Sequence, residues 1–206
     1  MTGAAAQRIH ACLKNETPYG LCLNADDAPR GLRNVTPQQR LALTQKTWSQ
    51  VGLEGFRFRF LFEQHPLSLE GEPYGDPGHY WASMMRFLNG PDFLGLMRQV
   101  TGLEAIAFAD AQATLYRSGN FLTAHDDEVA GTNRLAAYVM SFTEAWRPEW
   151  GGLLEFIDDD NRIAAGFMPD FNSLRLFRIP MSHHVSMVTP FAGVGRYSIT
   201  GWLRAR

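Results

Sequence analysis

The segment 116–128 decides the fold; it reads YRSGNFLTAHDDE. A turn signal at Ser118-Gly119-Asn120 precedes a run that ends in His125-Asp126-Asp127. Alternate side chains share a face in an extended chain, so His125 and Asp127 point together and Asp126 points away. A neutral imidazole and a carboxylate are thereby presented side by side.

A second source of histidine lies further along the chain, in the run SHHVSMV at 182–188. Two imidazoles and one carboxylate on one face of an octahedron form the facial triad of non-haem Fe(II) oxygenases. His183 and His184 fall on opposite faces of a strand, so only one of them enters such a site. Each piece is common by itself, as a chance His-x-Asp or a surface histidine pair. The order of the pieces, followed by Arg196 on the last expected strand, makes the pattern specific.

The composition bounds the class of protein. The chain has 206 residues, 45% of them hydrophobic, and a net charge of -2, which predict one packed domain. Near-neutral charge argues against a nucleic-acid binder or a polybasic membrane-surface protein. Two cysteines are too few for a disulfide scaffold. No stretch has the apolar length of a signal peptide or a membrane span, so we expect a cytoplasmic protein.

The first half of the chain predicts mainly helices. Thr36 is a candidate cap, Pro37 suits the first helical position, and Gln39 completes a capping box for a helix to about Trp48. Two more helices are expected over 79–88 and 91–100. Residues 56–60 alternate as a strand would, and the Pro- and Gly-rich segment 66–78 is interpreted as a long loop and a candidate lid.

From residue 106 onward the pattern changes to short strands separated by turns. Strands are expected over the ranges 106–116, 134–142, 153–157, 162–166, 174–178, 183–188 and 196–203. This spacing predicts a sandwich or jelly roll. The expected fold is a single α+β domain over 1–206, with helical support over about 1–103 on the outer face of a β core over about 104–206.

The second half resembles a known family, the 2-oxoglutarate- and Fe(II)-dependent dioxygenases. Within it the resemblance is to the prolyl-4-hydroxylase-like branch, which includes the prolyl hydroxylases that act on ribosomal proteins. The matching motifs are Tyr-x-x-Gly-x-Phe and His-Asp-Asp-Glu in 116–128, Trp-Gly-Gly at 150–152, His-x-Val-Ser-x-Val at 183–188, and Arg-Tyr-Ser-Ile-x-Gly-Trp at 196–202. The resemblance implies a double-stranded β-helix, the cupin-like form of the jelly roll.

The resemblance also implies the ligand set. It makes His125, Asp127 and His183 the iron ligands and leaves His184 as an outward or lip neighbour. It implies Fe(II), 2-oxoglutarate and O2 as cofactors, with ascorbate as a possible reductant, and hydroxylation of an unactivated C–H bond with release of succinate and carbon dioxide. Because Asp127 fills the position that halogenases leave open for halide, halogenation is not expected.

The expected cosubstrate contacts start from Arg196, a planar donor that can pair with the far carboxylate of 2-oxoglutarate. Ser198 shares its strand face and can add a hydrogen bond, and Trp202 would wall the pocket nearer the iron. The resemblance adds the Tyr116 hydroxyl and the Leu122 side chain. It places a tyrosine where this chain has Met140, so Tyr138, taken to lie on the same face, is the expected substitute; a core position for Tyr138 is the alternative.

The substrate is less defined by the sequence. The expected reaction is hydroxylation of a prolyl residue in a protein or peptide, and the alternatives are a free amino acid or other small metabolite, or a non-catalytic jelly-roll sensor or scaffold. An acidic lip for a basic peptide could be formed by Asp126, Glu128, Glu70, Glu72 and Asp76. Trp146 and Trp150 are further candidates for the lip, and an anchored hairpin is the alternative reading of both.

Overall fold

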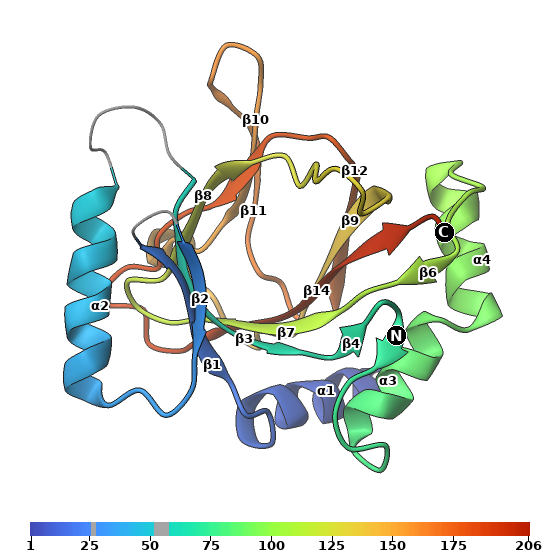
Figure 1. The fold of residues 1–206 in the computed structure, drawn as a ribbon, viewed down its shortest axis with the longest axis horizontal. Helices are drawn as coiled ribbons and strands as arrows, with labels where there is room; N and C mark the ends of the chain where they lie inside the picture. Colours follow the sequence, from blue (N-terminus) through green and yellow to red (C-terminus); the bar gives the residue numbers. More distant parts are fainter. Residues whose placement is uncertain (26–27, 52–57) are drawn as a thin grey trace.

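The computed structural model describes residues 1–25, 28–51 and 58–206 and shows a strongly curled antiparallel sheet with helices outside it (Figure 1). The main path of the sheet runs β11-β10-β13-β8-β3-β7-β14-β9-β12. Its strands in chain order are β3 (Phe60–Pro66), β7 (Gln112–Tyr116), β8 (Phe121–His125), β9 (Arg134–Ser141), β10 (Leu154–Ile157), β11 (Ile163–Phe167), β12 (Ser173–Arg178), β13 (His183–Val185) and β14 (Arg196–Arg204). The predicted α+β jelly-roll class is confirmed.

Strand β3 joins the two halves of the curled sheet. Its first residues pair with β8, and its second half pairs with β7. The other edge of β3 carries β1 (Gly20–Ala25), which in turn pairs with β2 (Ala28–Leu32). The short strand β6 (Phe108–Ala109) extends β14. The strands β8, β13, β10 and β11 therefore form one wall, and β7, β14, β9 and β12 form the opposite wall.

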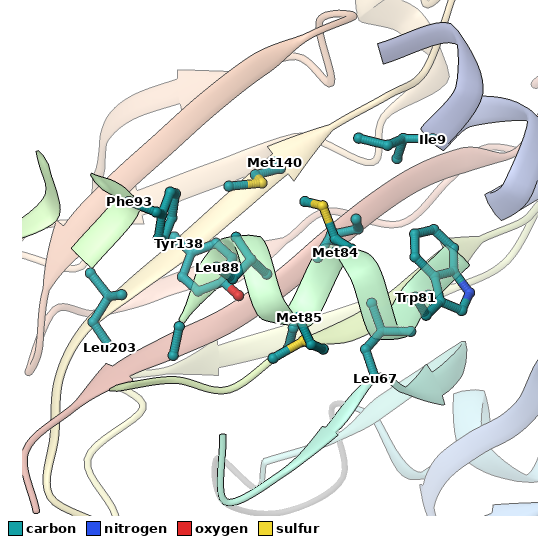
Figure 2. Close-up of a cluster of buried hydrophobic side chains, with 14 of the residues drawn as sticks. Ile9, Leu67, Trp81, Met84, Met85, Leu88, Phe93, Tyr138, Met140 and Leu203 are labelled. Carbon is teal, nitrogen blue, oxygen red and sulfur yellow. The ribbon is translucent and has the colours of Figure 1, made fainter. Parts of the chain in front are cut away.

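Three helices cover the outer face of the second wall. They are α1 (Gly3–Asn15), α3 (Tyr80–Leu88) and α4 (Pro91–Thr101). Their apolar faces meet the outward side chains of β9 and β14 in one buried cluster, part of which is drawn in Figure 2. The expectation that helices pack on the outer face of the sheet is confirmed for these three.

Helix α2 (Pro37–Gln50) packs elsewhere, beside β1 and β3 (Figure 1). The predicted capping box is present: the Thr36 hydroxyl accepts from the Gln39 amide, and the Gln39 side chain accepts from the Thr36 amide. Polar contacts hold the helix, because the buried Glu63 carboxylate on β3 binds Arg40 of α2 at 2.6 Å. The same carboxylate accepts from Arg117 Nε, which follows β7.

The substitution Glu63→Gln is expected to lower the free energy of unfolding by about 1–3 kcal/mol, because it removes a nearly buried charge from two guanidinium partners. The loss stays below that of a fully buried pair, since both arginines can rehydrate. Urea unfolding measures it. The matched control is Glu149→Gln, whose carboxylate is exposed beside Arg147, and a change within about 0.5 kcal/mol is expected there. Equal effects of the two substitutions would contradict this reading.

Three expectations about the first half need correction. Helix α1 and strands β1 and β2 were not predicted, so this half holds one more helix and more strand than expected. The segment 66–78 is no structureless loop, because it holds the hairpin of β4 (Ser68–Leu69) and β5 (Glu72–Pro73). Leu67 is fully buried in the cluster under the helices, which places the start of this segment on the outer layer. The strand expected over 56–60 is described only from residue 58, and β3 begins at Phe60.

In the parts of the chain that the structure describes, no helix combines the length and the apolar character that crossing a membrane requires.

Candidate metal and cosubstrate site

The three candidate metal ligands come together at one end of the first wall. His125 ends β8, His183 begins β13, and the two are direct partners across these strands. Their ring centroids lie 4.1 Å apart. Asp127 faces both: its Oδ1 lies 3.6 Å from His125 Nε2, and its Oδ2 lies 3.5 Å from His183 Nε2. The ligand atoms of the three residues all lie within 4.8 Å of one another.

Hydrogen bonds to the backbone fix both imidazoles in the tautomer whose Nε2 atom can bind a metal. His125 Nδ1 donates to the Thr123 carbonyl at 3.0 Å, and His183 Nδ1 donates to the Met181 carbonyl at 2.8 Å. A ring nitrogen that donates carries the proton in neutral histidine, so both Nε2 atoms keep a free lone pair. Burial, reinforced by His125, lowers the pKa of His183 to about 4, so its imidazole is neutral at pH 7. Two neutral imidazoles and a carboxylate form a donor set that suits Fe(II).

The position of Asp127 is set by its backbone conformation and by Arg134, a residue that was not predicted to belong to the site. Its φ is 63°, in the left-handed region that aspartate tolerates better than most residues. Arg134 Nη1 donates to the Asp127 carbonyl oxygen at 3.2 Å and lies 3.9 Å from Oδ1. The Arg134 guanidinium lies 3.7 Å from the centre of the Trp202 ring. Arg134 therefore links the candidate carboxylate ligand to Trp202.

His184 points away from this cluster. Its Nε2 lies 2.6 Å from Glu155 Oε2, and Glu155 is its direct partner across β10 and β13. The structure therefore places His183 with His125 and Asp127, and it places His184 on the other face of the strand.

A cavity of about 530 Å³, mouth included, lies between the two walls and is bordered by all three candidate ligands. One side is polar and belongs to the inner faces of β7 and β14; its lining residues are Gln112, Thr114, Tyr116, Arg196 and Thr200. The other side, formed by β3 and the first wall, is apolar and includes Phe62, Leu122, Leu154 and Val185, and Phe177 of β12 adds an aromatic ring from the second wall. Aromatic contacts run along β3 from Phe58, beside His125, through Phe60 to Phe62, which stacks on Tyr116.

Arg196 is a buried cation without a carboxylate partner among the described residues. Only 2% of its surface is exposed, its Nε has no hydrogen-bond partner, and its guanidinium lies 5.1 Å from the centre of the Tyr116 ring. Burial lowers its pKa. An unpaired buried charge is costly, and an anion that enters the cavity relieves that cost. Arg196 therefore fits the remote carboxylate of a dicarboxylic cosubstrate.

The other expected cosubstrate contacts differ in where they lie. Tyr116, Leu122 and Trp202 border the cavity, as expected. Ser198 is fully buried on the inner face, with an unpartnered hydroxyl. It does not border the cavity, whereas Thr200, two residues further along β14, does.

Tyr138 was expected on the inner face, with a core position as the alternative; its ring occupies the core position, although the residue also borders the cavity. The inner face of β9 carries Ala137 and Val139, while Tyr138 and Met140 join the cluster under the helices. Figure 2 shows the Tyr138 ring between Phe93 and Leu88. Its hydroxyl donates to the Asp110 carbonyl at 2.7 Å, so the hydroxyl is already engaged within the protein.

Tyr138→Phe is expected to lower the free energy of unfolding by about 1 kcal/mol, the value of one hydrogen bond, without changing affinity for 2-oxoglutarate. Tyr116→Phe is the matched comparison, since the Tyr116 ring borders the cavity, and its 2-oxoglutarate affinity is expected to fall several-fold. Thermal unfolding and cosubstrate titration measure the two quantities. A tenfold loss of cosubstrate affinity in Tyr138→Phe would restore the rejected role.

The expected substrate lip is only partly supported. Asp126 and Glu128 are exposed beside Asp127, and the Asp126 carboxylate accepts from the Glu128 amide. Trp146 and Trp150 instead anchor their own turn, as the alternative reading held. The Trp146 N–H donates to the Gly151 carbonyl, and the two indoles pack edge to face at 5.3 Å. Neither indole borders the cavity.

The remaining acidic candidates lie away from the cavity. Glu70 and Glu72 border a separate depression beside Arg204, and Asp76 borders another with His79. Their expected contribution to a lip around the candidate metal ligands is therefore wrong. The reason is that the hairpin β4–β5 carries Glu70 and Glu72 on the outer layer of the molecule, and Asp76 follows that hairpin in the chain.

A second group of metal-type side chains, Cys12, Glu16 and His79, also lies within 4.8 Å. Its chemistry is unsuitable for a metal. His79 Nδ1 already accepts from the Trp81 amide as a helix cap, and Arg8 occupies the Glu16 carboxylate. Burial raises the pKa of the Cys12 thiol to about 12, which opposes the thiolate form that binds metals.

Comparisons with known proteins agree with this site and fold. Residues 111–204 match the family model of the 2OG-Fe(II) oxygenase superfamily. A prolyl-4-hydroxylase from Pseudomonas putida superimposes with a TM-score of 0.56 and 20% identity, over 98% of this chain and 99% of that one. An oxidoreductase of the 2OG-Fe(II) oxygenase family from Burkholderia pseudomallei superimposes with a TM-score of 0.56 and 13% identity, over 98% of this chain and 91% of that one. A prolyl 4-hydroxylase from Phytophthora capsici superimposes with a TM-score of 0.51 and 13% identity, over 97% of this chain and 65% of that one. These identities show the fold alone. No curated protein matches the sequence.

Within this chain, the segment 111–204, which carries all three candidate ligands and Arg196, matches the 2OG-Fe(II) oxygenase superfamily. Its enzyme class is that of the 2-oxoglutarate-dependent dioxygenases, and its fold is that of the prolyl-4-hydroxylase-like members. The family implies Fe(II), 2-oxoglutarate and O2, which the His-Asp-His set and the buried arginine fit.

Proposed function

We propose that this enzyme hydroxylates a prolyl residue of a protein or peptide, with His125, Asp127 and His183 holding Fe(II) and Arg196 binding 2-oxoglutarate. The observation that carries the cofactor assignment is one cavity bordered both by three convergent ligands and by a buried unpaired arginine. Fe(II), 2-oxoglutarate and O2 together supply oxidation of an unactivated C–H bond, with release of succinate and carbon dioxide.

The chain's own residues orient the reactants. Backbone carbonyls fix the tautomers of His125 and His183, and Arg134 restrains Asp127, so the ligand atoms are preorganised. Arg196 binds the remote carboxylate of the cosubstrate on the polar side of the cavity. The apolar wall of phenylalanine and leucine side chains keeps bulk water from the reacting groups.

A prolyl substrate suits the walls of the cavity. The Trp202 indole and the apolar wall offer flat and aliphatic surfaces to a saturated ring. Arg134 lies beside Trp202 with its side chain partly exposed, and its guanidinium has several N–H groups with which it can donate to a substrate carbonyl. One of the solved structures that superimpose over 98% of this chain is a prolyl-4-hydroxylase.

The test is a turnover assay with matched peptide libraries. Purified enzyme is incubated in air with Fe(II), 2-oxoglutarate and ascorbate, and with proline-containing peptides, the same peptides carrying alanine, or free proline. We expect succinate formation and a mass gain of one oxygen atom on proline, in the first library only. Asp127→Ala is the inactive control. Oxygen incorporation into free proline, with none into peptides, would overturn the peptide assignment in favour of a small-metabolite substrate.

A further inference from the structure

The two ends of the curled sheet are strands β11 and β12, and an apolar groove lies between them. In the described part of the chain, β11 pairs with β10 alone and β12 pairs with β9 alone, so each strand has a free edge. The groove has a volume of about 920 Å³, open solvent included. Apart from Arg175, its lining residues are all apolar, and they are Phe156, Ile157, Ala164, Ala165, Phe167, Leu176, Phe177 and Met181.

The free edge of β11 lacks the features by which proteins usually protect such an edge. Residues 163–167 read IAAGF and contain no charged residue and no proline. Ile163 is 60% exposed, and the hairpin of β10 and β11 projects from the body of the molecule (Figure 1). On an edge strand, alternate backbone N–H and C=O groups point outward and can pair with another strand. The edge of β11 is therefore suited to binding an extended peptide.

The groove adjoins the metal cavity. Phe177 borders both, and its ring centroid lies 4.7 Å from that of His183. Met181 also borders the groove, and its carbonyl oxygen accepts the hydrogen bond from His183 Nδ1. Arg196 lies on the polar side of the cavity, on β14, and does not border the groove. A peptide in the groove therefore runs beside a candidate metal ligand and leaves the Arg196 side open to the cosubstrate.

We propose that a segment of the protein substrate binds to the free edge of β11 as an additional strand, with apolar side chains in the groove. The inference rests on the proposed function and deepens it, because it assigns the substrate an extended, apolar segment next to the hydroxylated proline. Backbone hydrogen bonds to the edge supply affinity, and the apolar lining selects the side chains. Strand β11 has 5 residues and is about 16 Å long, which sets the length of the segment.

The experiment follows one probe on the wild-type enzyme. The probe is the nonapeptide Lys-Val-Ser-Val-Pro-Val-Ser-Val-Lys with both ends blocked, and the enzyme is loaded with redox-inert Mn(II) and 2-oxoglutarate. Calorimetry measures binding, and mass spectrometry measures hydrogen–deuterium exchange. Bound probe is expected to slow amide exchange in β11 at least about tenfold, because outward amides become hydrogen-bonded. Bound probe that leaves exchange in β11 unchanged refutes the proposal.

Two methylated analogues of the probe test the backbone pairing. One carries N-methyl groups on its valines and the other on its serines and lysines, and in an extended chain these two sets of amides point to opposite edges. We expect one analogue to bind at least about tenfold more weakly than the probe, the effect of one to two hydrogen bonds, and the other to stay within about threefold of it. Equal affinities of the two analogues contradict the proposal.

The matched protein variants are Ala164→Trp and Ala42→Trp. Ala164 is exposed, borders the groove, and has no partner on β10 because the register shifts there, so an indole at this position occupies the groove rather than the core. Ala164→Trp is expected to bind the probe at least about tenfold more weakly and to keep its affinity for 2-oxoglutarate. Ala42 is an exposed residue of α2, and its substitution should spare both affinities. Undiminished affinity of Ala164→Trp for the probe overturns the proposal.

The remaining outcomes separate this proposal from the proposed function. A circular-dichroism melting curve checks that Ala164→Trp is folded, and the analogues with wild-type enzyme decide if it is not. Protection of β11 that grows with enzyme concentration in the absence of probe assigns the edge to a second copy of this chain and excludes the proposal. Binding of 2-oxoglutarate without binding of the probe also excludes it and leaves the cofactor assignment intact. Hydroxylation of free proline alone refutes the proposed function, whereas hydroxylation of the nonapeptide without protection of β11 refutes only the groove.

Discussion

Asp127→Ala is expected to weaken Fe(II) binding at least about 100-fold and to abolish turnover, because the two imidazoles lose the one carboxylate that faces them both. His183→Ala is expected to have the same effect. Anaerobic equilibrium dialysis followed by metal analysis measures the binding directly. Measuring metal content rather than rate separates loss of the ion from loss of a later step.

The matched control for these variants is His184→Ala. The His184 ring contacts Glu155 on the opposite strand face, so its removal is expected to change Fe(II) affinity by less than about threefold. Loss of metal in His184→Ala with retention in His183→Ala would reverse the assignment. Retention of metal by Asp127→Ala would contradict the three-ligand site itself.

Arg196→Met is expected to raise the dissociation constant of 2-oxoglutarate at least about 100-fold, since the remote carboxylate would then be buried without a charged partner. The same substitution is expected to preserve or raise the melting temperature of the ligand-free protein. Arg196 is a buried charge with no carboxylate partner in the described structure, and a methionine of similar length removes that cost. Binding and stability therefore change in opposite directions.

Fluorescence titration measures the cosubstrate affinity, and differential scanning calorimetry measures the melting temperature. Arg40→Met is the control: it removes an arginine that binds the Glu63 carboxylate outside the cavity, so it should cost stability and spare the affinity. An Arg196→Met protein that loses stability and keeps its 2-oxoglutarate affinity would show that Arg196 is a structural residue.

The sequence predicted those elements whose formation depends on residues close together in the chain. The capping box at Thr36 and Gln39 stabilises a helix start whatever the helix packs against, and α2 begins there. The His-x-Asp spacing predicted that both side chains meet, and they do. However, Asp127 lies beyond the end of β8 with a φ of 63°, so its backbone turn rather than strand alternation brings it to His125. Choosing His183 over His184 required the family pattern, since alternation alone says only that the two differ.

Register was harder to predict, because a shift of one residue moves every side chain of a strand to the other face. Tyr138 and Met140 were both assigned to the inner face of β9, and both point toward α3 and α4. Either face could have been the inner one on apolar content, since Ala137 and Val139 alternate with them. The deciding contact, from the Tyr138 hydroxyl to the Asp110 carbonyl, links residues that no local pattern relates.

Arg134 and Gln112 were missed for a similar reason. Arg134 is the first residue of β9, and an arginine at a strand end indicates no particular function by itself. Its role depends on Asp127 and Trp202, which lie beside it only in the folded protein. Gln112 gains its position through pairing with β14, far along the chain. Contacts of this kind are set by tertiary packing.

The central claim is that one cavity holds Fe(II) at His125, Asp127 and His183 and holds 2-oxoglutarate at Arg196. Anaerobic addition of Fe(II) and then 2-oxoglutarate, followed by visible absorption spectroscopy, tests it most directly. We predict a weak charge-transfer band that appears only with both additions, is lost in Asp127→Ala, and decays with formation of succinate when air is admitted. Absence of the band in the wild-type enzyme, with no succinate formed in air, would contradict the claim.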